Sequence, residues 1–343
     1  MSGVTAKQLK VAIVGATGFL GREVLKAMDE SELLLIDPVL LATADGVGEV
    51  LTCQGADVTS DSLADADFKD VTVALFCCDA ETTKKYAPKA MQAGALVLDA
   101  SGGLREKGVL LKTLEGISSP QDLRTKGGVL PQPIAQSLSV VLGGINDKFP
   151  ITEATASTYQ TVAGAGFGAV EEVAAQSAGL LGGGAEGGFS SDLFAHQAAF
   201  NVLPQVGAFT ENGTTAEEDL IAADFAKLQG GFPLSVSCAY VPTFVGDAVD
   251  VSLRFNADTA PAPEDIRDLF SPASGVMVLD DVAQNEYATP YGTAETSYVF
   301  LSRVRRDPAF KNGLKLWIAA DHIRVAQARK LVKYTETIAH QVQ

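Results

Sequence analysis

Short apolar runs alternate with amphipathic stretches along the first part of the chain. Four runs have the length and β-branched content of buried parallel strands: KVAIV, PVLLATA, VTVALFCC and ALVLDAS. The segments REVLKAMDE and KKYAPKAMQAG have the spacing of helices that cover a sheet. This alternation over residues 10–131 predicts an α/β fold with a doubly wound parallel sheet of the Rossmann type.

The pattern changes in the second part of the chain. Three longer runs alternate apolar with polar side chains, many of them Thr and Ser: ITEATASTYQTV, PLSVSCAYVPTF and AVDVSLRFN. Such alternation is typical of an antiparallel sheet with one covered face. Helices are expected within AVEEVAAQSAGLLGG and TAEEDLIAADFAKL, and a loop over residues 182–188. We therefore expect a second, α+β domain with a mixed or antiparallel sheet.

The length of the chain bears on its division into domains. Its 343 residues exceed what one compact core usually holds. We place a Rossmann-like dinucleotide-binding domain at residues 1–131 and the α+β domain at residues 132–320. The last segment begins as a strand and continues as a long helix, so residues 321–343 are expected to join the first domain.

A glycine-rich turn follows the first predicted strand at once. Gly15, Gly18 and Gly21 lie between that strand and a helix. Glycines let the backbone approach a pyrophosphate, and the helix start supplies free N–H groups. The alternative is a tight turn that only packs the helix on the strand. The candidate cofactor-binding residues of this turn are Gly15, Thr17, Gly18, Phe19 and Gly21.

Asp45 lies near the end of the second predicted strand, 24 residues after Gly21. An acid there grips ribose hydroxyls in NAD sites, and its charge repels a 2′-phosphate. Asp45 therefore favours NAD over NADP if a dinucleotide binds. The alternative is an exposed turn residue before Gly46. The ligand crevice of such a sheet is expected beyond the strand ends, near Gly15, Asp45, Cys78 and Ser101.

Charge and composition exclude several classes of partner. The 26 Lys and Arg residues stand against 42 Asp and Glu, a formal charge of -16. Such a surface repels phosphate backbones and anionic lipids, so neither nucleic acid nor a membrane is expected as a partner. The four cysteines lack metal-ligand spacing, and no metal site is expected. No signal-like or membrane-spanning apolar run is seen, which predicts a cytoplasmic protein.

Five segments in order carry a family resemblance: VAIVGATGFLGREVL, ASTYQTVAGAG, FNVLPQVG, CAYVPTFVGDAVDV and FLSRVRRDPAFKNGLKLWIAADHIR. The chain resembles the aspartate-semialdehyde dehydrogenase family over nearly its full length. The resemblance implies a Rossmann domain, and a second domain with the active site and dimer interface. It also implies NADP(H)- and phosphate-dependent interconversion of aspartyl phosphate and its semialdehyde, a step of amino-acid biosynthesis. A homodimer is expected, and a mixed dimer with a paralogue is left open.

The resemblance also implies a cysteine nucleophile, a histidine base and an arginine that pairs with the substrate carboxylate. Here Pro133 occupies the position of the cysteine, Asp247 that of the histidine and Tyr240 that of the arginine. Proline has no nucleophilic group. By the same resemblance, Asp45 and Gly46 replace an Arg-Ser pair that holds the 2′-phosphate. The chain is therefore closest to degenerate paralogues that lack the catalytic cysteine.

Other family positions are partly kept. Gln160 matches the active-site glutamine, and Arg105 matches a phosphate-binding arginine, although a salt bridge would explain Arg105 equally well. Glu217 keeps the acid of a substrate and phosphate pair in which Leu220 replaces the lysine, and His322 replaces an asparagine. These departures remove cations from the site of a family whose ligands are anionic.

Three functions follow as alternatives. The first is a catalytically silent member of the family that binds a ligand or partner. The second is an NAD-dependent oxidoreductase of altered chemistry, with Asp247 and Tyr240 as an acid–base pair. The third is residual semialdehyde dehydrogenase activity rescued by a distant cysteine, for which Cys78 is the candidate, although Cys77 and Cys78 are equally explained by buried packing.

Overall fold

The computed structural model describes residues 8–112, 120–183, 192–256 and 260–341. The chain divides into two compact units. Unit 1 comprises Met1–Pro131 and Ala326–Gln343, and unit 2 comprises Gln132–Val325. The two units are taken in turn.

Unit 1 is built on a seven-stranded sheet in the order β10-β11-β9-β8-β2-β4-β7. Its strands are β2 (Val11–Val14), β4 (Val39–Ala42), β7 (Asp61–Ser62), β8 (Val73–Phe76), β9 (Leu96–Asp99), β10 (Val109–Leu110) and β11 (Gly128–Val129). All neighbouring pairs are parallel. The strand order changes direction at β2, which lies between β8 and β4. This is the switch point beyond which ligands bind in open α/β sheets.

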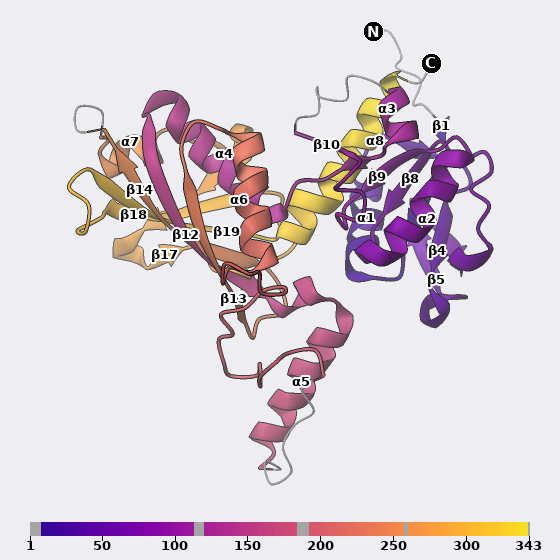
Figure 1. The fold of residues 1–343 in the computed structure, drawn as a ribbon, viewed down its shortest axis with the longest axis horizontal. Coiled ribbons are helices and arrows are strands. Elements are labelled where there is room, and N and C mark those ends of the chain that lie inside the picture. The colour runs from indigo at the N-terminus through magenta and orange to yellow at the C-terminus, as the bar shows by residue number, and fades with distance from the viewer. Residues whose placement is uncertain (1–7, 113–119, 184–191, 257–259, 342–343) are drawn as a thin grey trace. The chain divides into compact units, whose positions relative to one another are not determined.

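Both faces of this sheet are covered. The helices of unit 1 are α1 (Phe19–Asp29), α2 (Ala80–Gln92), α3 (Pro120–Thr125) and α8 (Arg329–Gln341). Val11 and Ile13 share one core with α1 and α8, whereas Ala12 and Val14 share the other with α2. Figure 1 shows α1 and α8 together, with the C-terminal helix in yellow. The sheet is therefore doubly wound, as predicted.

Two further details of unit 1 bear on the prediction. The structure adds a short pair, β1 (Gln8–Leu9) with β3 (Leu34–Leu35), and a hairpin of β5 (Val50–Cys53) and β6 (Ala56–Thr59). Helix α2 begins at Ala80, earlier than the apolar spacing suggested. Its N-cap is Asp79, whose Oδ1 accepts a hydrogen bond from the Thr82 N–H at 2.8 Å.

Unit 2 is built on a six-stranded mixed sheet in the order β13-β12-β14-β19-β18-β15. Its strands are β12 (Ile151–Thr161), β13 (Leu234–Val241), β14 (Asp247–Phe255), β15 (Val276–Val278), β18 (Val299–Arg306) and β19 (Gly313–Ala320). The central pairs are antiparallel, whereas β12 with β13 and β15 with β18 are parallel. The predicted fold class, a Rossmann-type sheet and an α+β domain with a mixed sheet, is confirmed.

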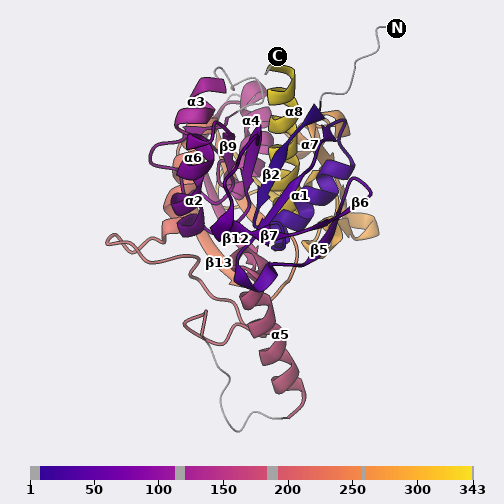
Figure 2. The same cartoon turned by 90° about the vertical axis from the view of Figure 1, so that its right-hand side faces the viewer.

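Helices cover one face of the sheet in unit 2. They are α4 (Pro133–Lys148), α6 (Ala216–Leu228) and the short α7 (Pro263–Arg267), and their apolar residues share a core with the strands. Helix α5 (Phe167–Leu181) instead extends away from this sheet in both ribbon views (Figures 1 and 2). A small hairpin pairs β16 (Asp280–Asp281) with β17 (Glu286–Tyr287). Most of the expected loop at residues 182–188 lies outside the described residues.

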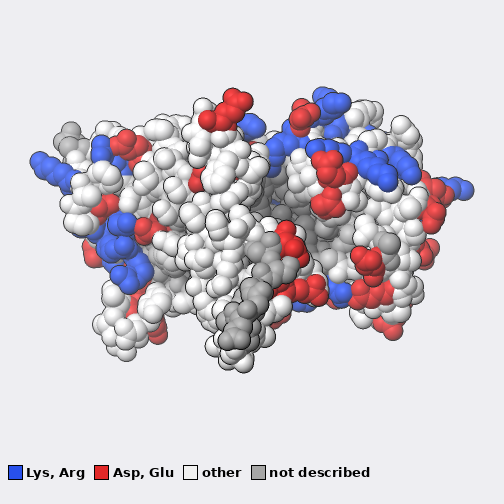
Figure 3. Space-filling view, turned by 60° about the horizontal axis from the view of Figure 1, so that its bottom comes forward, with Lys and Arg blue, Asp and Glu red and all other residues white. Residues whose placement is uncertain are grey.

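The described part of the chain gives two further findings. None of its helices is both long and apolar enough to cross a membrane. Its His, Cys, Asp and Glu side chains form no group of three that could hold a metal ion. On the face drawn in Figure 3, red acidic side chains lie among blue basic ones, so neither sign forms a continuous field there.

Candidate functional site

The glycine turn of unit 1 is shaped by close backbone approaches. Gly15 has a φ of 83°, and a Cβ there would come within 2.9 Å of the carbonyl oxygen of Cys77. A Cβ at Gly21 would strike the carbonyl oxygen of Gly15. Gly18 is the exposed N-cap of α1, and its Cβ would meet only that same oxygen, at 3.4 Å. Packing alone therefore requires Gly15 and Gly21, whereas Gly18 is the glycine that packing constrains least.

The turn after β4 lies directly against the glycine turn. Asp45 is exposed within the single helical turn Ala44–Gly46. A Cβ at Gly46 would strike the Oγ1 of Thr17, and the N–H of Gly15 donates to the carbonyl of Leu41 at 2.8 Å. The structure thus brings the Asp45 turn beside Thr17 of the predicted cofactor-binding turn. Gly46 thus permits the close packing of the two turns, as Gly15 and Gly21 permit close packing within the glycine turn.

A polar network closes the ends of β8 and β9. Asp99 is fully buried, and its carboxylate accepts from the N–H groups of Ser101 and Leu104 at 2.7 and 2.8 Å. The Ser101 hydroxyl lies 2.9 Å from that of Thr83, which in turn lies 3.4 Å from the Cys78 sulfur. Burial raises the pKa of Cys78 to about 11, so the thiol stays protonated at neutral pH.

Arg105 follows this network along the chain. Its side chain is half-buried, and Nη2 donates to the carbonyl of Leu130 at 3.5 Å. Arg105 thus belongs to unit 1, whereas Glu217, the other predicted substrate residue, belongs to unit 2.

Pro133 is the first residue of α4, after the N-cap Gln132. Gln132 makes two hydrogen bonds to α6: its backbone N–H donates to the Asp224 carboxylate at 2.8 Å, and its side-chain Nε2 donates to the Glu217 carboxylate at 2.6 Å. Proline suits a first helical position, because its missing N–H would have no partner inside the helix there. The segment is therefore a well-anchored helix start. Sequence reasoning missed the roles of Gln132 and Asp224, which are 92 residues apart in the chain.

Gln160 and Tyr240 lie opposite each other on the parallel strands β12 and β13. The Gln160 amide donates from Nε2 to the Thr158 hydroxyl at 3.1 Å. Burial raises the pKa of Tyr240 to about 12, and the charges of Glu217 and Asp247 add to the rise. The structure thus gathers Gln160, Tyr240, Glu217 and Asp247 in one region of unit 2, and leaves the phenol protonated at neutral pH.

Asp247 opens β14 and is held by contacts on both carboxylate oxygens. Its Oδ1 accepts from the N–H of Thr161 at 2.6 Å, and its Oδ2 lies 2.9 Å from Nδ1 of His322. Gly246, with a φ of 70°, precedes it because a Cβ there would strike the carbonyl oxygen of Pro290. The pairing of Asp247 with His322 was not foreseen. Strands β14 and β19 are neighbours, and their register sets Asp247 opposite Ala320, two residues before His322.

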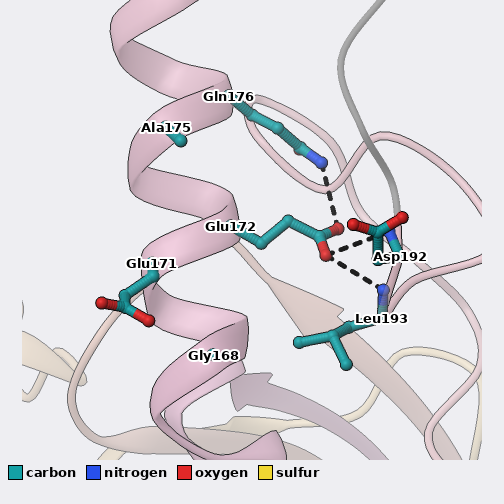
Figure 4. A pocket seen from close by; sticks show the side chains of 7 residues that line it. All are labelled: Gly168, Glu171, Glu172, Ala175, Gln176, Asp192 and Leu193. Atoms are coloured by element: carbon teal, nitrogen blue, oxygen red, sulfur yellow. Dashed lines mark hydrogen bonds between the residues drawn. The ribbon is translucent and has the colours of Figure 1, made fainter.

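A cavity of about 400 Å³ lies elsewhere in unit 2, along α5 (Figure 4). It is lined by Gly168, Glu171, Glu172, Ala175, Gln176, Asp192 and Leu193. The Glu172 carboxylate accepts from Nε2 of Gln176 and from the N–H groups of Asp192 and Leu193. The Glu172 carboxylate therefore holds the segment that begins at Asp192 against α5. None of the predicted site residues lines this cavity.

Two family profiles match the chain, and together they cover most of it. The one described as the NAD binding domain of semialdehyde dehydrogenase matches residues 10–143, and the one described as its dimerisation domain matches residues 142–325. They define a class of proteins built from these two domains in this order.

Individual relatives narrow the class. The aspartate-semialdehyde dehydrogenase of Aquifex aeolicus is 34% identical over 337 residues, covering 96% of this chain and 97% of that protein. The enzyme of Legionella pneumophila is 32% identical over 339 residues, covering 97% and 96%. The chain belongs to the aspartate-semialdehyde dehydrogenase family.

Solved structures agree with this assignment. Aspartate semialdehyde dehydrogenase II from Vibrio cholerae, complexed with ASA, superposes with a TM-score of 0.89 at 28% identity, covering 98% of this chain and all of that one. The enzyme from Candida albicans, solved with NADP, gives a TM-score of 0.69 at 17% identity over 99% of this chain and all of that one. The second likeness concerns the fold alone.

Proposed function

We propose that this chain is a member of the aspartate-semialdehyde dehydrogenase family that does not catalyse the family's phosphorylating reaction. The observation that carries the proposal is Pro133, which the resemblance sets at the position of the nucleophile and which serves here as the first residue of α4. Loss of a nucleophile alone commonly lowers kcat by about 10⁶. Asp247 and Tyr240 at the positions of the base and the carboxylate clamp support the same conclusion.

The local charge supports it as well. The family's ligands carry a 2′-phosphate, a carboxylate and a reacting phosphate. In unit 2 the charges that act on Tyr240 include the carboxylates of Glu217 and Asp247. In unit 1 the acid at the position where the resemblance sets the 2′-phosphate is Asp45, which is exposed. Anionic ligands meet repulsion at these positions rather than attraction.

The direct test is an assay of the purified chain with aspartate semialdehyde, NADP and phosphate. We expect no NADPH above the rate without protein. NADPH formation that depends on phosphate, and that is abolished by a substitution at Pro133 or at Cys78, would overturn the proposal. Loss of that activity on substitution of Cys78 would favour a rescuing cysteine, the third alternative.

A second candidate function is an NAD-dependent oxidoreductase of altered chemistry. The order of strand, glycine turn and helix, with the exposed Asp45 in the turn that packs beside Thr17, suits a dinucleotide without a 2′-phosphate. A bound nicotinamide would supply hydride acceptance, which needs no covalent nucleophile, and the protonated Tyr240 with Asp247 would supply acid–base groups. Calorimetry with NAD and NADH tests this function. Absence of binding at millimolar cofactor would exclude it.

We also propose that the chain self-associates through unit 2. The match to a dimerisation domain over residues 142–325 supports a homodimer, and a mixed dimer with an active paralogue is the alternative. Sedimentation velocity of the chain alone at micromolar concentration is expected to give a dimer. A monomer that pairs only after addition of the paralogue would favour the mixed dimer.

A further inference from the structure

His322 is a buried histidine with one satisfied ring nitrogen. It follows Ala320, the last residue of β19, by two positions, and only 2% of its surface is exposed. Its Nδ1 lies 2.9 Å from Oδ2 of Asp247. Its Nε2 is buried and has no hydrogen-bond partner among the described residues. A buried polar atom without a protein partner is uncommon, and a water or a ligand group would satisfy it.

The contacts of Asp247 fix which nitrogen carries the proton. An ionised carboxylate only accepts hydrogen bonds. Its Oδ1 accepts from the N–H of Thr161, and Oδ2 therefore accepts from Nδ1–H of His322. In a neutral imidazole, the proton on Nδ1 leaves a lone pair on Nε2. The geometry of Asp247 thus prepares Nε2 of His322 as a proton acceptor.

We propose that Asp247 and His322 form an acid–base dyad in unit 2, in which Nε2 of His322 binds the hydroxyl group of a small uncharged ligand. The hydroxyl donates a hydrogen bond to the Nε2 lone pair, while the ring keeps its Nδ1–H on Asp247. Asp247 is the positioning residue, and His322 is the group that touches the ligand. A π-helical turn, Ile323–Ala328, follows at once, a local irregularity that often accompanies functional sites.

The charges near the dyad decide the class of ligand. Asp247 and Glu217 both lie close enough to Tyr240 for their charges to raise its pKa. Buried Asp321 and Arg324, close to His322 in the chain, carry opposite charges. With Asp247 and Glu217 the carboxylates outnumber the cation, which disfavours an acid or a phosphate ester. An alcohol without an anionic group meets no such penalty. The proposal deepens the second candidate function by naming its proton acceptor and ligand class, and it concerns unit 2 alone.

The tautomer of His322 is the first test. The chain has three histidines, and the other two, His196 and His340, are exposed. Long-range ¹H–¹⁵N spectra of ¹⁵N-histidine-labelled protein would therefore give few signals, and His322→Asn would assign one set. At about pH 8, where an ordinary imidazole is neutral, we expect a protonated Nδ1 and an unprotonated Nε2. A doubly protonated ring, the state of a purely structural ion pair, or a proton on Nε2 alone would overturn the dyad.

Asp247→Asn tests the positioning role, with His196→Asn as the matched control. We expect Asp247→Asn to lose the single tautomer and the control to leave the His322 signals unchanged. If Asp247→Asn does not fold, the ligand titration below on the native chain still decides the proposal. A folded Asp247→Asn chain with the tautomer unchanged would contradict the role of Asp247.

Propylene glycol and lactate test the ligand class. The two molecules are alike except that propylene glycol has a hydroxymethyl group where lactate has a carboxylate. Propylene glycol is expected to shift the Nε2 signal in a saturable manner at concentrations where lactate does not. A shift by lactate first would overturn the uncharged class, and no saturable shift by either would overturn the hydroxyl site. If NAD does not bind, the oxidoreductase function is excluded, but the titration of His322 with propylene glycol and lactate still gives its own answer. Failure of the oxidoreductase function and failure of the hydroxyl site can therefore be told apart.

Discussion

Gln132 donates a hydrogen bond from its Nε2 to Oε2 of Glu217 over 2.6 Å, across 85 residues of sequence. The bond joins the N-cap of α4 to the first turn of α6, and the Gln132 N–H adds a second link to Asp224. Two carboxylates of one helix thus anchor the start of another. The residues that surround Pro133 serve helix docking, and this docking can be measured.

Replacement of Gln132 by Leu is expected to destabilise unit 2. The change removes a charge-assisted bond and leaves the Glu217 carboxylate without this donor, a loss of about 1–3 kcal/mol. The measurement is denaturant unfolding followed by a probe in unit 2. Gln121→Leu is the matched control, because Gln121 is exposed on α3 and its side chain makes no hydrogen bond to the described residues. Equal midpoints for the two variants would show that the Gln132 bond contributes nothing.

Pro133→Cys is expected to supply a reactive thiol without restoring the family reaction. A thiolate in the first turn of α4 is favoured by the helix N-terminus, so iodoacetamide should modify the introduced thiol before the native cysteines. Aspartate semialdehyde oxidation should stay at the level of the native chain, since Asp247 and Tyr240 still replace the implied base and clamp. Mass spectrometry and an NADPH assay check the two statements. Phosphate-dependent turnover by this single variant would show that Pro133 alone blocks the reaction, and would contradict the statement that Asp247 and Tyr240 also prevent it.

Cys78 is expected to be a poor nucleophile whose protonation stabilises unit 1. Burial raises its pKa from 9.0 to about 11, with smaller contributions from Asp79 and Asp99. The folded chain keeps the proton to higher pH than the unfolded chain, so this stabilisation is complete below pH 9 and is lost as the pH rises towards 11. Alkylation at neutral pH should be about a hundredfold slower than in the denatured chain.

The matched variant for this prediction is Cys78→Ser. It should flatten the fall in unfolding free energy above pH 9, and it should leave any measured activity unchanged. A loss of semialdehyde oxidation in Cys78→Ser would instead make Cys78 a nucleophile, and would support the third alternative over the first.

Gly15→Ala is expected to destabilise unit 1 more than Gly48→Ala does. Both glycines have a φ above 80°, so both variants incur the strain of a left-handed backbone, about 1–2 kcal/mol. Only Gly15 also faces a carbonyl oxygen, that of Cys77, within 2.9 Å of a new Cβ, whereas Gly48 has nothing within 4 Å. The difference between the unfolding midpoints of Gly15→Ala and Gly48→Ala therefore reports the destabilisation caused by the close contact of Gly15, after β2, with Cys77, after β8. Equal midpoints would refute that contact.

The sequence predicted this glycine turn because its cause is local. A strand, three glycines and a helix follow one another directly, and the structure has β2, Gly15 and α1 in that order. The same holds for α5 and α6, whose apolar spacing is contained in each segment. Helix starts that depend on a polar cap are harder to predict from apolar spacing. Helix α2 begins earlier than predicted because Asp79 caps it ahead of its first apolar positions.

Contacts between distant segments could not be predicted in the same way. Asp247 and His322 are separated by 75 residues, and their hydrogen bond depends on the pairing of β14 with β19. The parallel pairing of β12 with β13 likewise follows from the connection through α5 and α6 and not from the alternation in either strand. The sequence named Asp247 and Tyr240 as a pair, whereas the partner that hydrogen-bonds to Asp247 is His322.

Asp45 is expected to set the choice between NAD and NADP if unit 1 binds a dinucleotide. Its turn lies against Thr17, and its carboxylate is exposed, so it meets the ribose end of a ligand held by the glycine turn. Asp45→Ser should raise NADP affinity by about tenfold and lower NAD affinity, since it removes a like charge from the 2′-phosphate and an acceptor from the 2′-hydroxyl. Asp57→Ser, on the exposed strand β6, removes one charge elsewhere in unit 1 and should change neither affinity. Calorimetry with both cofactors measures the ratio. If both variants shift it equally, the effect belongs to net charge and Asp45 has no special role.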